Sequence, residues 1–463
     1  MSFINTIYNL LPVSIQNLGI SLWGIKWNKR RFGGIYTSEL NACKLREKYT
    51  LNEWNEYQTI QLRKILLHSF NHVPYYKELF NNLDISEDDI KKFNLHDLQK
   101  ITILQKSILR EKGTSELLSN KLESNGEFYA SSGSTGTPTQ ILFSAAMHQR
   151  WSALFEARIR NWAGLSINNP RGMIGGRRII NSPHAKPPYY RINKIEKQVY
   201  FSAYHIAPHA VSNYIKGMFD NHIDYMTGYA MSNYILARFI ENLHLKAPKL
   251  KAVITSSEKL TKEMRETFQR VYGCKSFDSY SGLEACGLIS ECEHASLHIS
   301  PDAGIIEIIK DDNTPAQPGE TGEAICTGFL NFDQPLIRYQ IGDLLKLSHN
   351  QTCKCGRNMP IIEEIVGRSE DTVVGKDGRE MVRFHGIFIQ IPSIIEGQII
   401  QNSLTQFEIN IVSASPLTLQ EKELMKNRMT SQLGEIELTI HEIPSIPRNQ
   451  NGKFKAVISH VKK

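Results

Sequence analysis

An alternation of strand-like and helical segments over residues 126–345 constrains the fold of this chain most. The apolar run from Ala252 to Thr255 predicts a buried strand, Glu258 to Val271 predicts a helix, and Cys274 to Phe277 predicts a second strand. Repeated strand–helix–strand units are typical of an α/β domain, in which helices flank a largely parallel sheet. We therefore expect an α/β fold with mixed and parallel sheets.

The segments on either side of this region have different patterns. Up to about residue 120 the spacing of Leu62, Ile65, Leu66 and Phe70 predicts helix. The run Ser86 to Asp89 predicts a capped helix start.

After Gly304 short alternating strands are expected, at Gly304 to Ile309 and at Gly322 to Thr327. Near the end of the chain, Leu417 to Leu433 predicts a helix and Ile436 to Ile440 a strand, followed by a loop at Pro447 to Gly452. At 463 residues the chain exceeds the roughly 250 to 300 at which one core stops growing. We expect a large N-terminal domain over residues 1–366 and a small C-terminal α+β domain over residues 372–463.

Composition and charge exclude several classes of protein. With 41% hydrophobic and 22% charged residues, the chain is neither disordered nor collagen-like. A net charge of +7 over this length is too diffuse to indicate nucleic-acid binding. We expect a cytoplasmic protein, because the sequence contains no signal-peptide pattern and no membrane-spanning run. The segment from Leu22 to Arg31 combines tryptophans with cations, which is compatible with a peripheral membrane contact or with an ordinary surface helix end.

A loop rich in glycine and hydroxyl groups follows a predicted strand and runs from Tyr129 to Pro138. Its central residues are Ser131, Ser132, Gly133, Ser134, Thr135 and Gly136. Such a loop can wrap phosphate oxygens, because glycine lets backbone N–H groups approach closely and hydroxyls add donors. It lacks the lysine of a Walker loop. Composition alone leaves a phosphate site and a surface turn equally open.

This loop resembles the phosphate-binding loop of the adenylate-forming enzymes, the superfamily of acyl-coenzyme A synthetases, luciferases and peptide synthetase adenylation domains. Four later segments resemble other motifs of that superfamily, in the same order: Asp278 to Glu284, Ile337 to Asp343, Gly367 to Asp371 and Pro447 to Lys453. Five ordered matches are far more specific than any one of them.

Within the superfamily the chain resembles the phenylacetate–coenzyme A ligase branch, and in particular its relatives of the CapK type in capsular polysaccharide biosynthesis. The residues that carry this likeness are His68 to Tyr76, Thr255 to Thr261, Glu291 to His298 and Cys353 to Arg357. The resemblance implies a ligase that adenylates a carboxylic acid with ATP and Mg²⁺ and releases pyrophosphate, and then AMP.

The resemblance also implies a role for each site residue. Residues 131–136 would hold the β- and γ-phosphates. Tyr280, with Ser281 beside it, would stack on adenine, and Glu284 would bind Mg²⁺. Asp343 would accept hydrogen bonds from the ribose hydroxyls, with Arg368 nearby. Lys453 would reach from the small domain to the α-phosphate and the incoming carboxylate.

The resemblance further implies a hinge at residues 367–371, where Glu370 and Asp371 would let the small domain rotate between adenylation and acyl transfer. The acceptor is a thiol, an amine or a hydroxyl, and a nucleotide sugar or a glycan fits the capsule setting. Coenzyme A stays open as the acceptor. Thr137 stands where many relatives carry lysine, and Ser281 replaces the glycine usual in the coenzyme A ligases.

Four residues form a candidate zinc site: Cys292, His298, Cys353 and Cys355. Three thiolates and one imidazole suit tetrahedral Zn²⁺, and both segments resemble metal-bearing parts of the branch. His294 is the alternative nitrogen ligand. The competing interpretation is a set of buried free cysteines beside an unrelated histidine.

Two further interpretations remain beside the adenylating enzyme. One is an inactive nucleotide-binding scaffold, and the other a phosphotransferase that would release ADP. The identity of the acid is not readable from the sequence. Rough alignment to the family offers six candidate pocket residues: Arg177, Arg178, His205, Met226, Tyr229 and Ser256.

Overall fold

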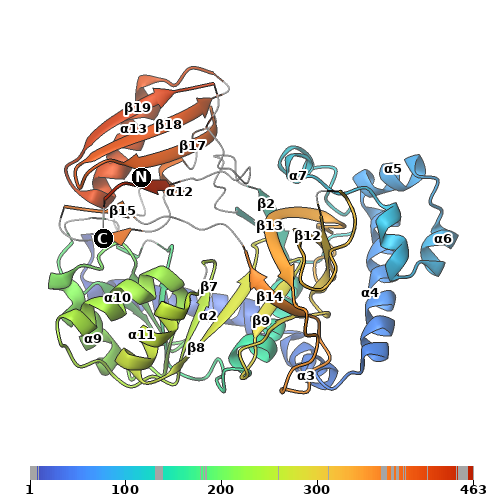
Figure 1. Cartoon of the computed structure of the whole chain (residues 1–463), viewed down its shortest axis with the longest axis horizontal. Helices are drawn as coiled ribbons and strands as arrows, with labels where there is room; N and C mark the ends of the chain where they lie inside the picture. Colours follow the sequence, from blue (N-terminus) through green and yellow to red (C-terminus); the bar gives the residue numbers. More distant parts are fainter. Residues whose placement is uncertain are drawn as a thin grey trace.

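A computed structural model describes most of the chain. The described residues are 8, 10–130, 139–177, 179–180, 182, 185–258, 260–310, 312–366, 373–376, 380–381, 385–388, 391, 393–413, 415–444, 446 and 457–461. They form a large body built on one 12-stranded sheet and a small one built on a 4-stranded sheet, as Figure 1 shows. The expected α/β fold is confirmed.

Helices dominate the first part of the chain, as its spacing predicts. They are α2 (Val13–Phe32), α3 (Tyr36–Arg46), α4 (Leu51–His72), α5 (Pro74–Asn82), α6 (Glu87–Lys92) and α7 (Lys106–Lys112), with a 3-10 turn at Leu95–Lys100. A capping box between Thr50 and Glu53 starts α4, and α4 buries Leu62, Ile65 and Leu66. Ser86 caps α6 in the same way, so that predicted helix start is confirmed.

The large sheet has a parallel half and an antiparallel half. In spatial order its strands are β11 (Gly304–Ile309), β12 (Thr321–Gly328), β13 (Tyr339–Leu347), β14 (Ile361–Ile365), β10 (Leu297–Ile299), β9 (Leu288–Glu291), β8 (Lys275–Ser281), β7 (Ala252–Ser256), β6 (Tyr225–Tyr229), β3 (Arg171–Gly175), β5 (Gln198–Ser202) and β4 (Tyr190–Asn193). The run from β8 to β5 is parallel, and the pairs outside it are antiparallel.

Parallel strands place their carboxyl ends at one edge of a sheet, where ligands of such folds bind. Helices α9 (Val211–Asp220), α10 (Ala230–Asn242) and α11 (Lys262–Tyr272) lie beside this half in Figure 1. Helix α11 begins four residues later than expected. The reason is Thr261, whose side chain accepts from the N–H of Met264 and caps the helix.

A separate hairpin leads into the glycine-rich loop. Strands β1 (Glu127–Ala130) and β2 (Gln140–Phe143) pair antiparallel, and α8 (Ala145–Phe155) follows them, with a π-helical turn at Glu156–Arg160. The strand expected before the loop is therefore present. Among the described helices, none combines the length and apolar character needed to cross a membrane.

The small body is the expected α+β unit. Its sheet has the order β19 (Glu437–Glu442), β18 (Gln406–Ser413), β17 (Ile394–Gln401), β20 (Val457–Ser459), and it packs with α13 (Leu419–Leu433). The short elements β15 (Val373–Val374), β16 (Glu380–Met381) and α12 (His385–Phe388) precede this sheet. A capping box between Thr418 and Glu421 starts α13, two residues after the expected start.

Candidate functional site

Two predicted nucleotide-site residues meet at the carboxyl edge of the parallel half. Tyr280 lies near the end of β8, and its hydroxyl donates to Oδ2 of Asp343 on β13 at 2.9 Å. In the sheet these strands are separated by β9, β10 and β14, so the contact depends on the curvature of the whole sheet. Burial and the Asp343 carboxylate raise the pKa of Tyr280 well above its ordinary value, which keeps the phenol a donor.

Glu284 lies in the loop after β8 and is only 6% exposed. Its Oε1 accepts from the hydroxyl of Tyr339 at 3.3 Å and from Oγ1 of Thr139 at 3.4 Å. Thr139 directly follows the predicted phosphate loop. The structure therefore brings the C-terminal end of that loop to Glu284, 145 residues further along the chain.

The surroundings of Glu284 fit a divalent cation. Within the described part of the chain, no lysine, arginine or histidine forms an ion pair with this carboxylate. Neutral hydroxyls alone compensate poorly for a buried negative charge. Mg²⁺ prefers carboxylate oxygens among protein ligands, so Glu284 is suited to hold it.

The structure thus brings together three of the predicted nucleotide-site residues, Tyr280, Glu284 and Asp343, and Ser281 follows Tyr280 at the end of β8. The other predicted residues lie outside the described ones: Ser131, Ser132, Gly133, Ser134, Thr135, Gly136, Arg368, Glu370, Asp371 and Lys453. Their roles stay predictions.

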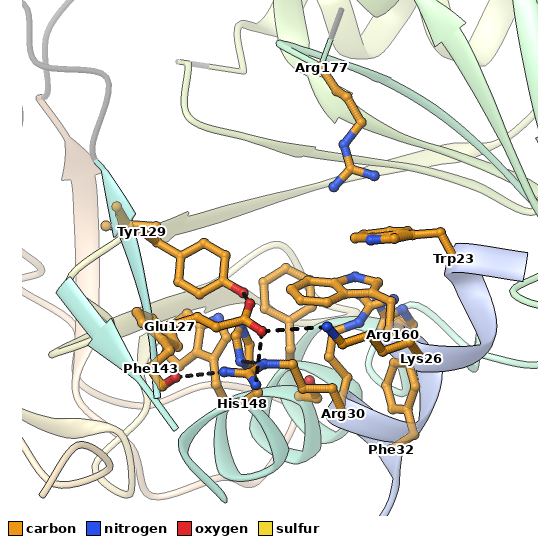
Figure 2. Close-up of a pocket in the computed structure, with 17 residues that line it drawn as sticks. Trp23, Lys26, Arg30, Phe32, Glu127, Tyr129, Phe143, His148, Arg160 and Arg177 are labelled. Atoms are coloured by element: carbon orange, nitrogen blue, oxygen red, sulfur yellow. Dashed lines mark hydrogen bonds and ion pairs between the residues drawn. The ribbon is translucent and has the colours of Figure 1, made fainter. Parts of the chain in front are cut away.

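A cavity of about 550 Å³ adjoins this cluster. Gly282 and Leu283, which separate Tyr280 from Glu284 along the chain, form part of its wall, and so does Tyr129 of β1. Figure 2 shows the cavity between α2, the β1–β2 hairpin and the strands of the large sheet. Its volume is typical of a small-molecule site.

Of the candidate pocket residues from the sequence, some line this cavity and others do not. Arg177, two residues after β3, lines the cavity. His205 is instead a core histidine, bonded to Oγ of Ser202 at 2.7 Å and to the carbonyl of Ser182 at 2.9 Å. Met226 is fully buried in the core. Tyr229 is the last residue of β6 and Ser256 the last of β7, and neither lines this cavity. Arg178 lies outside the described residues.

Helices α2 and α8 provide most of a cavity wall that the sequence did not predict. Trp23 and Trp27 stack on each other with ring centroids 5.2 Å apart, and both line the cavity together with His148. The run of tryptophans and cations near Arg31 was the available signal. This run predicts a surface helix end or a peripheral membrane contact, because nothing local indicates that one side of this helix faces a cavity.

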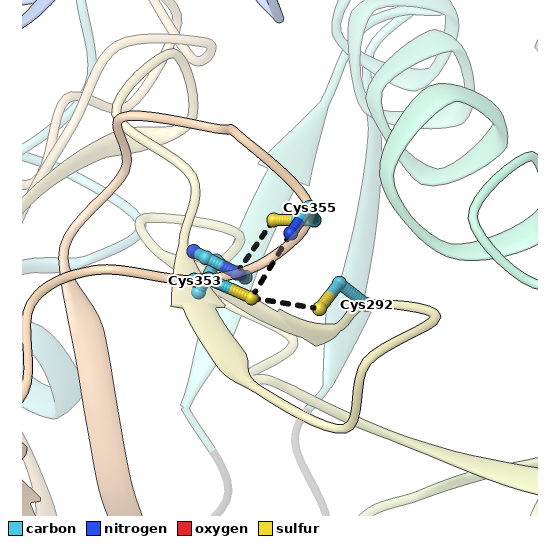
Figure 3. Close-up of side chains that lie close together, drawn as sticks. Cys292, Cys353 and Cys355 are labelled. Carbon is cyan, nitrogen blue, oxygen red and sulfur yellow. Dashed lines mark hydrogen bonds between the residues drawn. The ribbon is translucent and has the colours of Figure 1, made fainter.

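A second cluster joins the predicted zinc ligands. The ligand atoms of Cys292, His298, Cys353 and Cys355 all lie within 4.8 Å of one another. Figure 3 shows the three cysteines gathered at one point. Cys292 follows β9 and His298 lies in β10, while the loop before β14 carries the other two. The pairing of β10 with both β9 and β14 brings these segments together.

The geometry of this cluster fits tetrahedral zinc. Thiolates about 2.3 Å from a tetrahedral zinc ion lie roughly 3.8 Å apart. Here Sγ of Cys292 lies 3.7 Å from Sγ of Cys353, and Sγ of Cys355 lies 3.4 Å from Nε2 of His298. Nδ1 of His298 contacts the carbonyl of Met359 at 3.2 Å, which leaves Nε2 to face the thiols. The alternative ligand, His294, is not in the group.

The other four cysteines, Cys43, Cys274, Cys286 and Cys326, are buried, and burial raises the pKa of Cys43 and of Cys274 to about 12. They pack in the hydrophobic cores. None of the seven cysteines forms a disulfide bond.

Comparison with known proteins gives a consistent result. Residues 373–460 match the CapK C-terminal domain family. A crystal structure of 2-hydroxyisobutyryl-CoA ligase with 2-HIB-AMP and CoA aligns with 89% of this chain and 91% of its own, at a TM-score of 0.59 and 17% identity. Over 99% of its length the chain is 25% identical to the whole of protein CapK from Staphylococcus aureus. It is 24% identical to a phenylacetate-coenzyme A ligase of Escherichia coli strain K12, over 87% of this chain and 94% of that protein. By these comparisons the chain is similar to protein CapK and to acyl-coenzyme A ligases over most of its length.

The likeness to these relatives extends over 87% to 99% of the chain. The CapK match includes both the large body and the small one. The likeness to the crystal structure, at 17% identity, is one of fold. The resemblance of the five ordered motifs to the adenylate-forming enzymes is therefore supported independently by whole-chain comparison.

Proposed function

We propose that the protein activates a carboxylic acid with ATP and Mg²⁺ and passes the acyl group to an acceptor. In the first step a carboxylate oxygen attacks the α-phosphorus, the bond to the bridging oxygen breaks, and pyrophosphate leaves. In the second step a thiol, amine or hydroxyl attacks the acyl carbon, and AMP leaves. The observation that carries this proposal is the convergence of Glu284, Thr139, Tyr280 and Asp343 at the carboxyl edge of the sheet.

Each residue has a distinct task in this proposal. Glu284 holds Mg²⁺, which offsets the charge on the phosphates when it is bound. Tyr280 packs against adenine, while Asp343 accepts hydrogen bonds from the ribose. The loop of residues 131–136 donates backbone and hydroxyl hydrogens to the phosphates. Lys453 brings a positive charge to the α-phosphate and the incoming carboxylate, and Arg368 assists near the ribose.

In the same proposal the two domains have different roles. The N-terminal domain of residues 1–366 binds the nucleotide and the acid, and the domain of residues 372–463 supplies Lys453. Rotation about residues 367–371, with Glu370 and Asp371 as the pivot, exchanges the lysine for a surface that admits the acceptor.

The relatives support two kinds of acceptor. One relative is a phenylacetate-coenzyme A ligase, and the crystal structure contains CoA with an acyl-AMP, so the thiol of coenzyme A is the first candidate. Another relative is protein CapK, and we keep the amine or hydroxyl of a sugar, in capsule modification, as the second candidate. Either reaction consumes ATP, and we place it in the cytoplasm.

Pyrophosphate exchange into ATP tests the first step. We expect exchange with one acid from a panel of amino, aryl, short fatty and uronic acids. Lys453→Ala and Glu284→Gln are each expected to lower it by on the order of 100-fold, because each removes charge compensation at the phosphates. Matched controls are Lys426→Ala and Glu423→Gln, both exposed on α13, which should keep full exchange.

The outcomes also separate the rival functions. Absence of exchange with every acid, together with absence of ATP binding, would contradict the proposal and favour a scaffold. Release of ADP in place of AMP and pyrophosphate would favour a phosphotransferase.

The four-residue cluster of Cys292, His298, Cys353 and Cys355 is proposed to hold a structural Zn²⁺. The distances support it, and a set of four protein ligands leaves no open position for catalysis. Such an ion would tie the hairpin after Glu284 to the loop before β14.

Helix α2 is proposed to rest on an anionic membrane surface. Ile15, Leu18, Leu22 and Ile25 recur every three or four residues and are between 47% and 58% exposed. The exposed Lys26 and Lys29 lie on the same side of the helix. An apolar stripe beside lysines suits the boundary between headgroups and acyl chains.

Co-sedimentation with vesicles tests this contact. The protein should bind vesicles that contain phosphatidylglycerol and should bind pure phosphatidylcholine less well. Leu18→Glu with Leu22→Glu should weaken binding about tenfold or more, because two apolar side chains are lost from the interface. Leu243→Glu, an exposed leucine after α10, is the control. Equal binding of all variants, or a concentration-dependent dimer in place of vesicle binding, would contradict the proposal.

A further inference from the structure

The cavity beside Gly282 and Leu283 has an unusual charge balance. Five cationic side chains line it against a single carboxylate, Glu127; the five are Lys26, Arg30, Arg31, Arg160 and Arg177. Two of them form ion pairs with carboxylates that do not line the cavity: Arg31 pairs with Glu196, and Arg160 pairs with Glu156 at 3.0 Å. Lys26 and Arg30 share Glu127, at 4.0 and 3.6 Å.

Arg177 is left without a carboxylate among the described residues. Its Nη1 donates to the hydroxyl of Tyr200 at 3.2 Å, and its guanidinium carbon lies 5.2 Å from the ring centre of Trp23 and 5.1 Å from that of Tyr200. Figure 2 shows Arg177 reaching into the cavity from the side opposite Arg30, toward Trp23. Stacking fixes the plane of the guanidinium group and leaves its edge for a bidentate partner.

Other groups in the wall are affected by the same positive charge. Burial and the cations of Arg30 and Arg31 lower the pKa of His148 to about 4. Burial and neighbouring arginines, Arg171 and Arg160 foremost, lower the pKa of Arg31 to about 9. The Nε of Arg31 is also buried without a hydrogen-bond partner. The cavity is therefore short of negative charge and of hydrogen-bond acceptors.

The position of the cavity decides which group can supply that charge. Arg177 follows β3, and Gly282 follows β8, so both lie at the carboxyl edge that carries Tyr280 and Glu284. In the proposed reaction the reacting carboxylate becomes a mixed anhydride with the α-phosphate and loses its own charge. An acyl group without a second charge would leave the exposed guanidinium group of Arg177 without an anionic partner, whereas a second carboxylate would form a charge-assisted pair with it.

We propose that the acid activated by this protein carries a second anionic group, a carboxylate, which Arg177 binds in the aromatic-walled cavity. This inference rests on the proposed function, since it identifies the class of the acyl donor. It makes Arg177 a specificity-determining residue, and it makes the preferred substrate a dicarboxylic acid rather than the neutral-tailed acid of a phenylacetate ligase.

The experiment compares acids matched in carbon number in the pyrophosphate exchange assay: butanoate with butanedioate, pentanoate with pentanedioate, and phenylacetate with carboxyphenylacetate. The full-length protein should favour the dicarboxylic member of at least one pair. Arg177→Ala should raise the KM for that acid by about 10- to 100-fold, the value of a lost charge-assisted bond, and leave the KM for ATP unchanged. Arg177→Lys should recover part of the loss.

The control is Arg238→Ala, because Arg238 stacks on Tyr234 of α10 at 5.6 Å but lies outside the lining of this cavity. Circular dichroism of each variant checks that it is folded.

Preference for the monocarboxylic acids, unchanged by Arg177→Ala, would overturn the inference and leave the proposed function standing. A rise in the KM for ATP with every acid would also overturn it, because Arg177 would then serve the phosphates. Absence of exchange with all acids would remove the proposed function and the inference with it.

Discussion

His148 illustrates how a single contact fixes a protonation state. Nε of Arg30 donates to Nδ1 of His148 at 2.9 Å, so this nitrogen must carry a lone pair. Protonation would place two N–H groups against each other, next to a second cation, Arg31. The aromatic rings of Trp27, Tyr129 and Phe143 pack around the imidazole, which is buried.

A pH dependence follows from this neutral histidine. Because the pKa of His148 falls from 6.5 to about 4 on folding, its contribution to stability is complete above pH 6.5 and is lost as the pH falls toward 4. We expect the free energy of unfolding to lose about 2 kcal/mol between pH 7 and pH 5 from this group. His148→Gln keeps an acceptor for Arg30 without a titration, so its urea-unfolding free energy should change less over this range. The exposed His209→Gln is the control, and an identical slope in all three proteins would contradict the assignment.

At the residue scale the sequence predicted some site residues better than others. Tyr280, Glu284 and Asp343 belong to short motifs, and the structure brings them together. The cavity cations could not be predicted in this way. Arg31 pairs with Glu196 at a separation of 165 residues, and only the docking of α2 onto the sheet brings them into contact.

At the scale of elements the cysteine cluster depends on strand pairing. The sequence named its four members from residue type, but the spacing of Cys353 and Cys355 alone is not typical of zinc sites. The register that pairs Leu297 with both Glu291 and Ile362 brings Cys292, His298 and the later loop together. Sequence patterns predict strands such as β9 and β14, but they do not predict which strands become neighbours.

Metal removal tests this cluster. The purified protein is expected to contain about one zinc ion per chain by elemental analysis. His298→Asn should lower the zinc content and the melting temperature, because loss of a structural zinc ion costs on the order of several kcal/mol. His294→Asn, which changes the nearby histidine outside the group, should keep both. Zinc-free protein as purified, or loss of zinc in the His294 variant alone, would show the assignment to be wrong.

Local signals also set element boundaries that hydrophobic pattern misses. The pattern extends the predicted helix back to Glu258, whereas α11 begins at Lys262, after its cap at Thr261. The hydroxyl that accepts from Met264 N–H fixes the first turn. A search for such caps would have predicted this boundary.

At the scale of the whole molecule, the alternation of strands and helices predicted the α/β class but not the order of the large sheet. The contact between Tyr280 on β8 and Asp343 on β13 spans four positions of that order, across β9, β10 and β14. Both strands contribute to one core, which includes Tyr339 and Ile341, with Tyr280 packed against it. Long-range curvature of this kind arises from packing, for which the local sequence holds no signal.

The described residues of the small body form a core of their own, against which Tyr204 of the large body packs. Phe407, Ile409, Met425 and Met429 are its buried members, whereas Phe268 belongs to the core of the large body. If residues 372–463 are a separate domain, as the hinge prediction requires, the two bodies should unfold in distinct transitions. Separate cores allow this, because each body then loses its buried surface independently.

Calorimetry of the full-length protein tests the division with two matched substitutions. Phe407→Ala removes a buried ring from the small core and should cost about 3 to 5 kcal/mol. In a domain of this size that corresponds to a fall of more than about 10 °C in one transition. Phe268→Ala should lower the other transition and leave the first in place. If both substitutions lowered a single shared transition, the chain would unfold as one cooperative unit, and a rotation about residues 367–371 would have to disrupt packing that the two bodies share.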